Sequence, residues 1–329
     1  MIKKTEQEII KNWKGSIDEP IVSICCITYN HEAYIAKALD SFLMQETNFP
    51  FEIVVRDDAS IDNTANIIRK YEEKYPNIVK PIYEKENGYQ KGIKAMPIVE
   101  KKAKGEYFAY CEGDDYWTDS RKLQIQKDFL DKNKDYSMCF HETSVFIQEE
   151  NKIHTSTNNL KDKDIYLEDF LLSNQGRTCS FMYRNKNIKI PEIMKDLKFG
   201  DWIRHILQVQ NSKARYLSRN MAVYRVHSGG IWSGAQKKDI LLSEIKMLEF
   251  MDEYLNFKYS ELIYQRIGRN LFEISLIYMK NNQKFIDYSF SDFMNYTNIT
   301  YFKFIKEKIK IFLAKYPFVK RNIKRILRK

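Results

Sequence analysis

The chain has 329 residues, of which 43% are hydrophobic and 14% aromatic, so it can bury a sizeable core and is not a disordered protein. Its net charge is +10, but residues 303–329 hold eleven Lys and Arg against one Glu, and the other 302 residues balance at 43 basic and 43 acidic. Because nucleic-acid-binding proteins usually spread a basic stripe over the folded surface, we expect no nucleic-acid partner.

The cysteines and the hydropathy of the chain indicate a cellular location. The five cysteines are odd in number and lie mostly within apolar runs, which predicts reduced thiols in the core. Residues 1–13 mix charged with apolar side chains, and no later run approaches the roughly 18 apolar residues of a membrane-spanning helix. We therefore expect a cytoplasmic protein with neither a signal peptide nor a transmembrane segment.

Short apolar runs alternate with helical patterns in the first third of the chain. We expect strands at 21–27, 51–55 and 107–111, and helices at 35–43 and 61–71. Strands that are apolar throughout suit a mostly parallel sheet covered by helices on both faces. Such an open α/β domain binds its ligands beyond the carboxyl ends of the strands.

The rest of the chain contains a region of mixed pattern followed by a region of helical pattern. A helix is predicted from Thr118 or Asp119 to Leu130, and the polar stretch 148–164 predicts a surface loop or the end of a hairpin. From residue 233 onward apolar residues recur every three or four positions, which indicates a helical appendage.

Polar side chains follow each of the three predicted strands. The first strand ends in Thr28-Tyr29-Asn30, the second in residues 56–64 (RDDASIDNT), and the third in residues 112–117 (EGDDYW). Three such clusters at the carboxyl ends of neighbouring parallel strands would converge on one crevice.

The cluster after the second strand contains two adjacent carboxylates. Ser60 and Asp62 fit an ordinary turn and helix cap. Asp57 and Asp58 would repel each other at an apolar strand end unless something uses them. We interpret Asp58 as a carboxylate that binds the base or ribose of a nucleotide, and the alternative is that the whole cluster only caps the next helix.

The cluster after the third strand holds three carboxylates within four residues. Glu112, Asp114 and Asp115 would repel one another strongly after a buried strand, and a divalent cation would remove that repulsion. Mg²⁺ or Mn²⁺ prefers such oxygen ligands and keeps positions open for substrate phosphates. The alternative is an acidic loop that caps the helix near Thr118.

In the order and spacing of these motifs over residues 20–125, the chain resembles the glycosyltransferases of family 2, which have the GT-A fold, of the kind that builds bacterial cell-surface polysaccharides. The resemblance rests on Thr-Tyr-Asn after the first strand, on Asp-Asp-x-Ser-x-Asp-x-Thr at 57–64, on Gly105-Glu106-Tyr107, and on the variant Asp-x-Asp motif at 112–115. Two residues depart from the pattern, namely Ile27 in place of Pro and Glu112 in place of the first Asp.

The resemblance implies roles for individual residues. It implies that Asp58 contacts the base, that Asp114 lies near the donor ribose, and that Asp115 binds the metal on the diphosphate. We also assign the residues that follow the first strand, Thr28, Tyr29, Asn30 and Glu32, to nucleotide and donor binding.

Two further positions carry expectations. Asp201, in Phe199-Gly200-Asp201-Trp202, resembles the acidic motif that supplies the general base, although an Asp before an apolar helix is also an ordinary N-cap. His227, followed by Gly229 and Gly230, fits a loop that closes over the donor and touches the metal or diphosphate, although most lone histidines are structural.

The predicted reaction is an inverting, metal-dependent transfer from a nucleotide-diphosphate sugar, expected to be a UDP-sugar, to a hydroxyl of a glycan or lipid-linked acceptor. One rival is a nucleotidyltransferase, which would carry a Gly-rich phosphate loop after the first strand. The other is a nucleotide-sugar or glycan-binding module without catalysis, which would lack the metal and base carboxylates.

The domain division follows from these patterns. We expect a GT-A catalytic domain over 1–232, a helical appendage over 233–302, and a basic tail over 303–329. In the tail, Ile305, Ile309 and Phe312 begin an apolar stripe with Lys and Arg around it. This pattern predicts contact with an anionic membrane surface on the inner face of the cell membrane, or else docking on the appendage.

Overall fold

The structure is a computed structural model that describes residues 3–155, 161–186, 188–191, 197, 199–230 and 235–280. The chain divides into two compact units, one of residues 1–170 with 174–235 and the other of residues 171–173 with 236–329. The domain boundaries at 232 and 302 stay predictions, and the basic tail over 303–329 lies outside the described residues.

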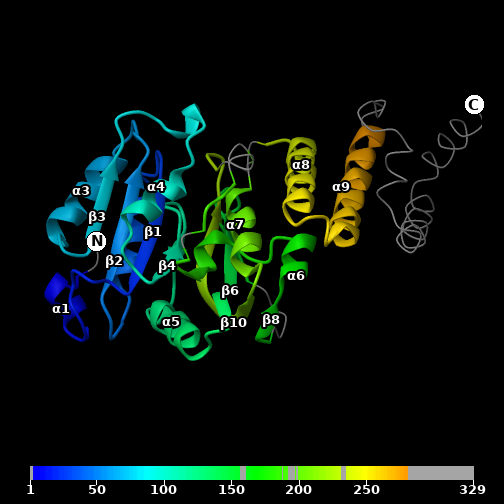
Figure 1. Cartoon of the computed structure of the whole chain (residues 1–329). Coiled ribbons are helices and arrows are strands. Elements are labelled where there is room, and N and C mark those ends of the chain that lie inside the picture. The colour runs from blue at the N-terminus through cyan, green and yellow to red at the C-terminus, as the bar shows by residue number, and fades with distance from the viewer. Residues whose placement is uncertain are drawn as a thin grey trace, which may run out of the picture. The chain divides into compact units, whose positions relative to one another are not determined.

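The first unit is built on one mixed sheet. Its strands are β1 (Val22–Thr28), β2 (Phe51–Asp57), β3 (Val79–Tyr83), β4 (Tyr107–Tyr110), β5 (Tyr116–Trp117), β6 (Tyr136–Ile147), β7 (Lys152–His154), β8 (Lys163–Ile165), β9 (Met182–Arg184) and β10 (Lys213–Val226). In the order β3-β2-β1-β4 the strands are parallel, and beyond β4 the sheet continues through β9, β6, β10 and β5. The predicted α/β sheet with parallel strands is therefore confirmed (Figure 1).

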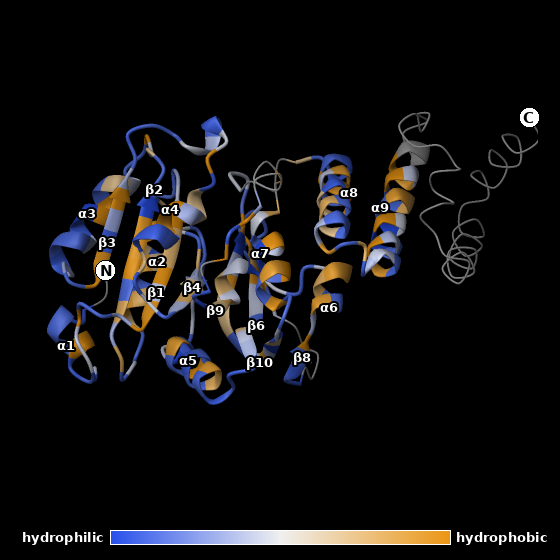
Figure 2. Ribbon diagram, in the orientation of Figure 1, coloured by the Kyte–Doolittle hydropathy of each residue, from blue (hydrophilic) through white to orange (hydrophobic). Residues whose placement is uncertain are grey.

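Helices fill the connections between the strands. They are α1 (Glu6–Ile10), α2 (Ile35–Leu43), α3 (Thr64–Lys74), α4 (Ala95–Lys102), α5 (Lys122–Lys132), α6 (Leu167–Leu172) and α7 (Gly200–Val209), with short 3₁₀ turns at Tyr89–Lys91 and Thr178–Ser180. In α2 the apolar residues predicted at helical spacing, from Ile35 to Leu43, are buried against the sheet. Figure 2 shows β1 and β2 as hydrophobic along most of their length, as expected of strands covered on both faces.

Three details differ from the sequence expectations. Strand β3 was not predicted, because Pro81 interrupts its pattern, and it occupies the edge of the sheet, where proline is tolerated. Helix α5 begins at Lys122 rather than near Thr118, because β5 and the backbone bond from Thr118 N to Met221 O continue the pairing with β10. The stretch 148–164 contains the predicted hairpin end, with β7 antiparallel to β6.

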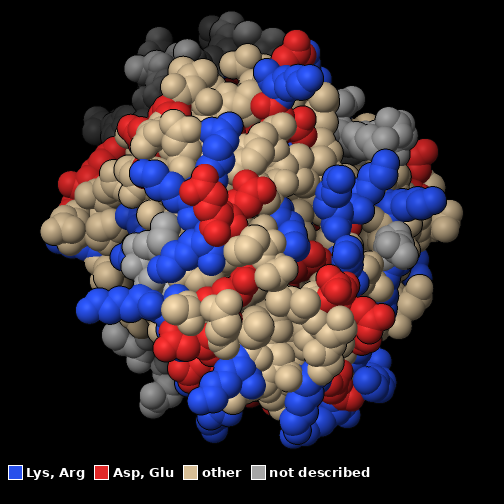
Figure 3. All heavy atoms as spheres, turned by 90° about the vertical axis from the view of Figure 1, so that its left-hand side faces the viewer, with Lys and Arg blue, Asp and Glu red and all other residues tan. Residues whose placement is uncertain are grey.

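The five cysteines are free thiols, and all are buried, as predicted for a reduced core. On the face shown in Figure 3, basic and acidic side chains are interspersed. This mixture agrees with the charge balance of the chain before residue 303.

The second unit contains the predicted helices. Helix α8 (Lys237–Tyr254) and helix α9 (Ser260–Lys280) are joined by a turn in which Asn256 and Phe257 have positive φ. Their buried apolar residues include Ile245 and Leu248 from α8 and Ile267 from α9. Within the described ranges, no helix is long and apolar enough to cross a membrane.

Candidate active site

The three predicted polar clusters meet at one edge of the sheet. Strand β1 lies between β2 and β4 and is parallel to both, so the carboxyl ends of the three strands are neighbours. Thr28 pairs with Asp57 in the β1–β2 register, and Gly113 N donates to Ile27 O from the loop after β4. The convergence that the sequence predicted is therefore present in the fold.

The loop after β1 is fastened to the loop after β2. Asn30 N donates to Ser60 Oγ (2.9 Å), and Asn30 Oδ1 accepts from Ile61 N (2.9 Å). Glu32 Oε2 accepts from Asn63 N (2.9 Å). Asn30 adopts a left-handed conformation (φ 53°), which asparagine tolerates better than most residues. Asn30 and Glu32, two of the predicted donor-binding residues, thus hold two site loops together.

Of the other two residues assigned after β1, Thr28 is buried and Tyr29 is half-buried. The Thr28 hydroxyl oxygen is buried and has no hydrogen-bond partner among the described groups. It lies beneath the loop after β4, because a Cβ added to Gly113 would stand 2.8 Å from that oxygen. Thr28 is therefore at the centre of the three strand ends.

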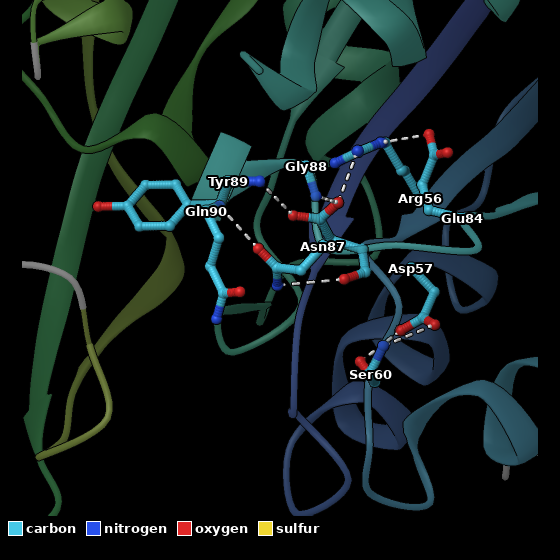
Figure 4. A network of polar contacts seen from close by, with 9 residues as sticks. Arg56, Asp57, Ser60, Glu84, Asn87, Gly88, Tyr89 and Gln90 are labelled. Carbon is cyan, nitrogen blue, oxygen red and sulfur yellow. Dashed lines mark hydrogen bonds and ion pairs between the residues drawn. The ribbon is translucent and has the colours of Figure 1, made fainter. Parts of the chain in front are cut away.

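Asp57 and Asp58 both have hydrogen-bond partners within the protein, and these partners offset the repulsion expected between the two carboxylates (Figure 4). Asp57 accepts hydrogen bonds from the backbone N and the hydroxyl of Ser60. Asp58 Oδ1 accepts from Arg56 Nη2 (2.6 Å), and the Arg56 side chain is only 1% exposed. Arg56 Nε also donates to Glu84 Oε1 (2.9 Å), so one buried guanidinium joins the ends of β2 and β3.

Asp58 also holds the loop that follows β3. Gly88 N donates to Asp58 Oδ1 (2.8 Å), and Tyr89 N donates to Oδ2 (3.0 Å). A Cβ at Gly88 would lie 2.7 Å from Arg56 Nη2, so only glycine allows this close approach. Asp58 is therefore a structural anchor of the site, and its predicted contact with a base stays a prediction.

Three side chains from distant parts of the chain form a candidate metal centre. His31, Asp114 and His227 each offer one ligand atom, and these atoms lie within 4.8 Å of one another. His227 Nε2 lies 3.0 Å from Asp114 Oδ2, and His31 Nε2 lies 3.9 Å from the same oxygen. The three come from the loops after β1, β4 and β10.

The chemistry of this cluster fits a divalent cation. Metal–ligand bonds of about 2.0–2.2 Å place neighbouring ligand atoms about 3–4.5 Å apart. The two distances from Asp114 Oδ2 to the histidines, 3.0 and 3.9 Å, lie in this range. Burial lowers the pKa of His31, which favours the neutral imidazole that a metal binds. Burial raises the pKa of Asp114, but the hydrogen bond from His227 and the electrostatic effect of the neighbouring His31 outweigh burial, so the net pKa lies below the ordinary value and favours the ionised carboxylate. Two nitrogens and one carboxylate suit Mn²⁺ better than Mg²⁺, which prefers oxygen.

Hydrogen bonds from Arg225 fix the position of the loop after β4 relative to the end of β10. Arg225 Nε donates to Asp114 O (2.8 Å), and Arg225 N donates to Asp115 Oδ1 (2.7 Å), so the end of β10 is pinned to the loop after β4. The Cβ of any residue replacing Gly113 would also lie 3.1 Å from His31 Nδ1, which explains the glycine.

Asp114, and not Asp115, is one of the three described side chains that cluster closely enough to hold a metal ion, and metal binding by Asp115 stays a prediction. We predicted Asp115 as the ligand and Asp114 as the ribose neighbour. Asp115 is 2% exposed, and burial, reinforced by the charges of Asp114 and Glu112, raises its pKa. Its Oδ1 accepts from Arg225 N at the end of β10, and its Oδ2 is buried with no hydrogen-bond partner among the described groups. His31 was not predicted, and its only sequence signal was its place after a strand end.

Asp201, the predicted general base, lies in the first turn of α7, and its catalytic role stays a prediction. The cap residue of α7 is Phe199, and Asp201 lies inside the first turn, so it is not the ordinary N-cap. Asn174 Nδ2 donates to Asp201 Oδ2 (3.1 Å). Burial raises the pKa of Asp201, while bonds from the Trp202 backbone and Asn174 act against the increase.

The carboxyl group of Glu112 is influenced electrostatically by both Asp114 and Asp201. Burial raises the pKa of Glu112 to about 8, with the charges of Asp114 and then Asp201 adding to the increase. Both carboxylates are thus near enough to act on it. The sequence had left open whether Glu112 reaches the metal, and Glu112 is not among the three described side chains that cluster as candidate ligands.

Comparison with known proteins identifies the family to which the chain is similar. The model of glycosyl transferase family 2 matches residues 23–190. An Escherichia coli protein named UDP-Glc:alpha-D-GlcNAc-diphosphoundecaprenol beta-1,3-glucosyltransferase WfaP is 29% identical over 68% of this chain and 85% of its own length. The putative teichuronic acid biosynthesis glycosyltransferase TuaG of Bacillus subtilis is 26% identical over 73% of this chain and 92% of its own.

Other relatives and a solved structure define how far the likeness reaches. An uncharacterized protein of Mycobacterium tuberculosis is 37% identical over 65% of this chain, and the match spans only 61% of that protein. The crystal structure of residues 1–349 of Staphylococcus aureus TarS with UDP-GlcNAc superposes with a TM-score of 0.59 at 21% identity, over 80% of this chain and 76% of TarS. The fold is therefore of the GT-A type.

Proposed function

The chain belongs to glycosyl transferase family 2, and from this premise we propose that it transfers a sugar from a UDP-sugar to a hydroxyl of a glycan or lipid-linked acceptor, with inversion at the anomeric carbon. The observation that carries the proposal is the His31–Asp114–His227 cluster at the carboxyl ends of the sheet. The named activity of WfaP supports both the UDP-sugar donor and a lipid-linked acceptor.

The three clustered side chains would hold a divalent cation, proposed as Mn²⁺. When bound, such a cation supplies Lewis-acid stabilisation of charge on a leaving diphosphate. Arg225 holds Asp114 through its backbone oxygen, so the carboxylate faces the two imidazoles in a fixed geometry. This proposal takes Asp114 as the carboxylate ligand in place of Asp115.

Donor binding is proposed at the loops after β1, β2 and β3. Asp58 fixes the loop that carries Gly88 and Tyr89, and Asn30 and Glu32 fix the loop that carries His31. These bonds organise the site before the donor arrives, which reduces the entropic cost of binding. Thr28, which lies beneath the loop after β4, and the half-buried Tyr29 remain proposed donor contacts.

Asp201 is the proposed general base. In a single displacement, the acceptor oxygen forms a bond to the anomeric carbon as the bond from that carbon to the diphosphate breaks, and the hydroxyl proton passes to Asp201. A carboxylate with a raised pKa is a stronger base than an ordinary aspartate, and burial raises the pKa of Asp201 in this way. Holding acceptor and donor in line supplies much of the remaining acceleration.

The two rival functions are less well supported. A nucleotidyltransferase would bind phosphates with a Gly-rich loop after β1, where this chain has Thr28-Tyr29-Asn30-His31. A binding module without catalysis has no need of a general base, and the raised pKa of Asp201 supports that role.

A thermal-shift screen tests the proposed donor and metal together. UDP, GDP, ADP and CDP are each added with and without Mn²⁺. At about 100 times its Kd, a ligand stabilises the folded state by about 2.7 kcal/mol. We expect UDP to raise the melting temperature and Mn²⁺ to increase that shift. A shift with another nucleotide alone would overturn the UDP assignment, and a UDP shift unchanged by Mn²⁺ would overturn the metal site.

A further inference from the structure

A chain of hydrogen bonds leads from Asp201 into the core of the first unit. Asn174 Nδ2 lies 3.1 Å from Asp201 Oδ2, and Asn174 Oδ1 lies 3.0 Å from His205 Nδ1. The other ring nitrogen, His205 Nε2, lies 2.8 Å from the hydroxyl of Tyr183. The four side chains come from the loop after α6, from β9 and from α7. We call Asn174, His205 and Tyr183 the relay.

The ionised state of Asp201 fixes the direction of every bond in the relay. A carboxylate only accepts, so Asn174 must present its NH₂ group to Asp201 and its carbonyl oxygen to His205. That oxygen only accepts, so His205 must carry its proton on Nδ1. Nε2 is then the acceptor, and the Tyr183 hydroxyl donates to it. One arrangement of protons satisfies all four residues.

The surroundings keep the histidine of the relay neutral. His205 and Tyr183 are both fully buried. The His205 ring stacks on Phe181 with ring centroids 3.9 Å apart, and Phe170 packs at 5.5 Å. Burial, and then the charge of Arg204, lowers the pKa of His205 to about 3. The ring therefore does not change its charge in the pH range of the reaction.

Charged groups from neighbouring elements also act on the two ends of the relay. Arg177, before the 3₁₀ turn, lowers the pKa of Asp201, and Glu112, after β4, lies near enough to interact with its charge. Arg204 faces His205 and forms an ion pair with Glu100 of α4. None of these charged groups is a member of the relay, so the variants tested below leave them in place.

We infer that Asn174, His205 and Tyr183 are positioning residues that hold the general base ionised and oriented toward the acceptor. Asn174 is exposed, and an exposed amide without a partner would sample several rotamers. The buried His205 imidazole, which is held by the Tyr183 hydroxyl, favours the Asn174 rotamer in which the NH₂ group faces Asp201. This inference rests on the proposed role of Asp201 as the base.

The kinetic test compares pH profiles of kcat. Asn174→Ala removes the donor to Asp201, so we expect the acid limb of the profile to move upward by about one pH unit. Tyr183→Phe touches neither Asp201 nor Asn174 and should move the limb in the same direction by a smaller amount. The matched control is Tyr75→Phe, a buried tyrosine whose hydroxyl donates to Lys4 O (2.8 Å), and its limb should stay at the wild-type pH.

A second readout does not depend on activity. The ring ¹⁵N chemical shifts of His205, assigned with a His205→Asn sample, report its tautomer. We expect the Nδ1-protonated neutral form from pH 5 to pH 8. An Nε2-protonated ring, or an imidazolium in this range, would overturn the relay. Asn174 is exposed, so Asn174→Ala should keep the melting temperature of the wild type within a few degrees.

The two hypotheses fail in different ways. If Asp201→Asn abolishes transfer while both relay variants keep the wild-type acid limb, the relay has no positioning role and the base assignment stands. If Asp201→Asn retains full turnover, the base assignment fails, and the catalytic role of the relay fails with it.

Discussion

His227 Nε2 lies 3.0 Å from Asp114 Oδ2, although 113 residues separate the two in the sequence. Arg225 makes this contact possible, because it bonds the backbone of Asp114 and the side chain of Asp115 from the end of β10. The long last strand thus returns a histidine to the loop after β4. The candidate metal centre depends on this pairing of two distant segments.

Replacing Asp114 and Asp115 by asparagine, one at a time, shows which of the two carboxylates binds the metal. Asp114→Asn should weaken Mn²⁺-dependent UDP binding by about 100-fold or more, because it removes the charged ligand of the cluster. Asp115→Asn keeps an oxygen that can accept from Arg225 N and should change binding far less. Calorimetric titration of UDP with Mn²⁺ measures both. The reverse order of effects would restore Asp115 as the ligand.

This difference shows what the sequence could and could not predict. The convergence of the loops after β1, β2 and β4 was predictable, because polar clusters followed apolar runs that had to be parallel. Which of two adjacent carboxylates faces the crevice was not, since it depends on the turn at Gly113 and on Arg225, a residue 110 positions after Asp115. His31 was missed because a lone histidine is uninformative without its spatial neighbours.

Strand β3 and the partners of the relay residues could not be predicted from the sequence either. Pro81 concealed β3, and with it the loop whose Gly88 and Tyr89 bond Asp58. Asn174 and His205 are 31 residues apart on different elements, and neither lies in a motif. Helix periodicity places His205 on the buried face of α7 but does not name its partners.

The buried guanidinium of Arg56 should be a strong determinant of stability. Arg56→Met leaves Asp58 and Glu84 without their cation, and breaking a buried ion pair in this way costs about 3–5 kcal/mol. Urea unfolding measures the loss. The control is Lys4→Met, which removes the exposed pair with Glu46 and should cost no more than about 1 kcal/mol. Equal losses in the two variants would show that the Arg56 network adds no stability.

The rate of transfer should fall in acid. Burial raises the pKa of Asp201 above that of an ordinary aspartate, and a general base works only when ionised. The value of kcat should therefore increase with pH through a pKa above about 4, the ordinary value. Measuring UDP and Mn²⁺ binding over the same pH range separates this limb from loss of metal. A limb at the ordinary aspartate value would contradict the assignment.

The basic tail over 303–329 remains a prediction from the sequence, namely that it binds anionic membranes. Each nearby Lys or Arg adds about 1 kcal/mol of attraction to anionic lipid. We expect the full chain to co-sediment with phosphatidylserine-containing vesicles at low salt and to be released as salt increases. A chain ending at Thr300 should remain in the supernatant. Equal partitioning of the two chains would show that the tail does not bind the membrane.

The most direct test of sugar transfer is a product measurement with the wild-type chain, Asp201→Asn and Asp114→Asn. The three proteins are incubated with a panel of UDP-sugars, Mn²⁺ and candidate glycan acceptors. UDP release is followed by chromatography, and the anomeric configuration of the product is read from its ¹H NMR couplings. We expect the wild-type chain to release UDP and form a product of inverted configuration, Asp201→Asn to be about 10²–10⁴-fold slower, and Asp114→Asn to be inactive. A product that retains the donor configuration, or full turnover by Asp201→Asn, would contradict the mechanism.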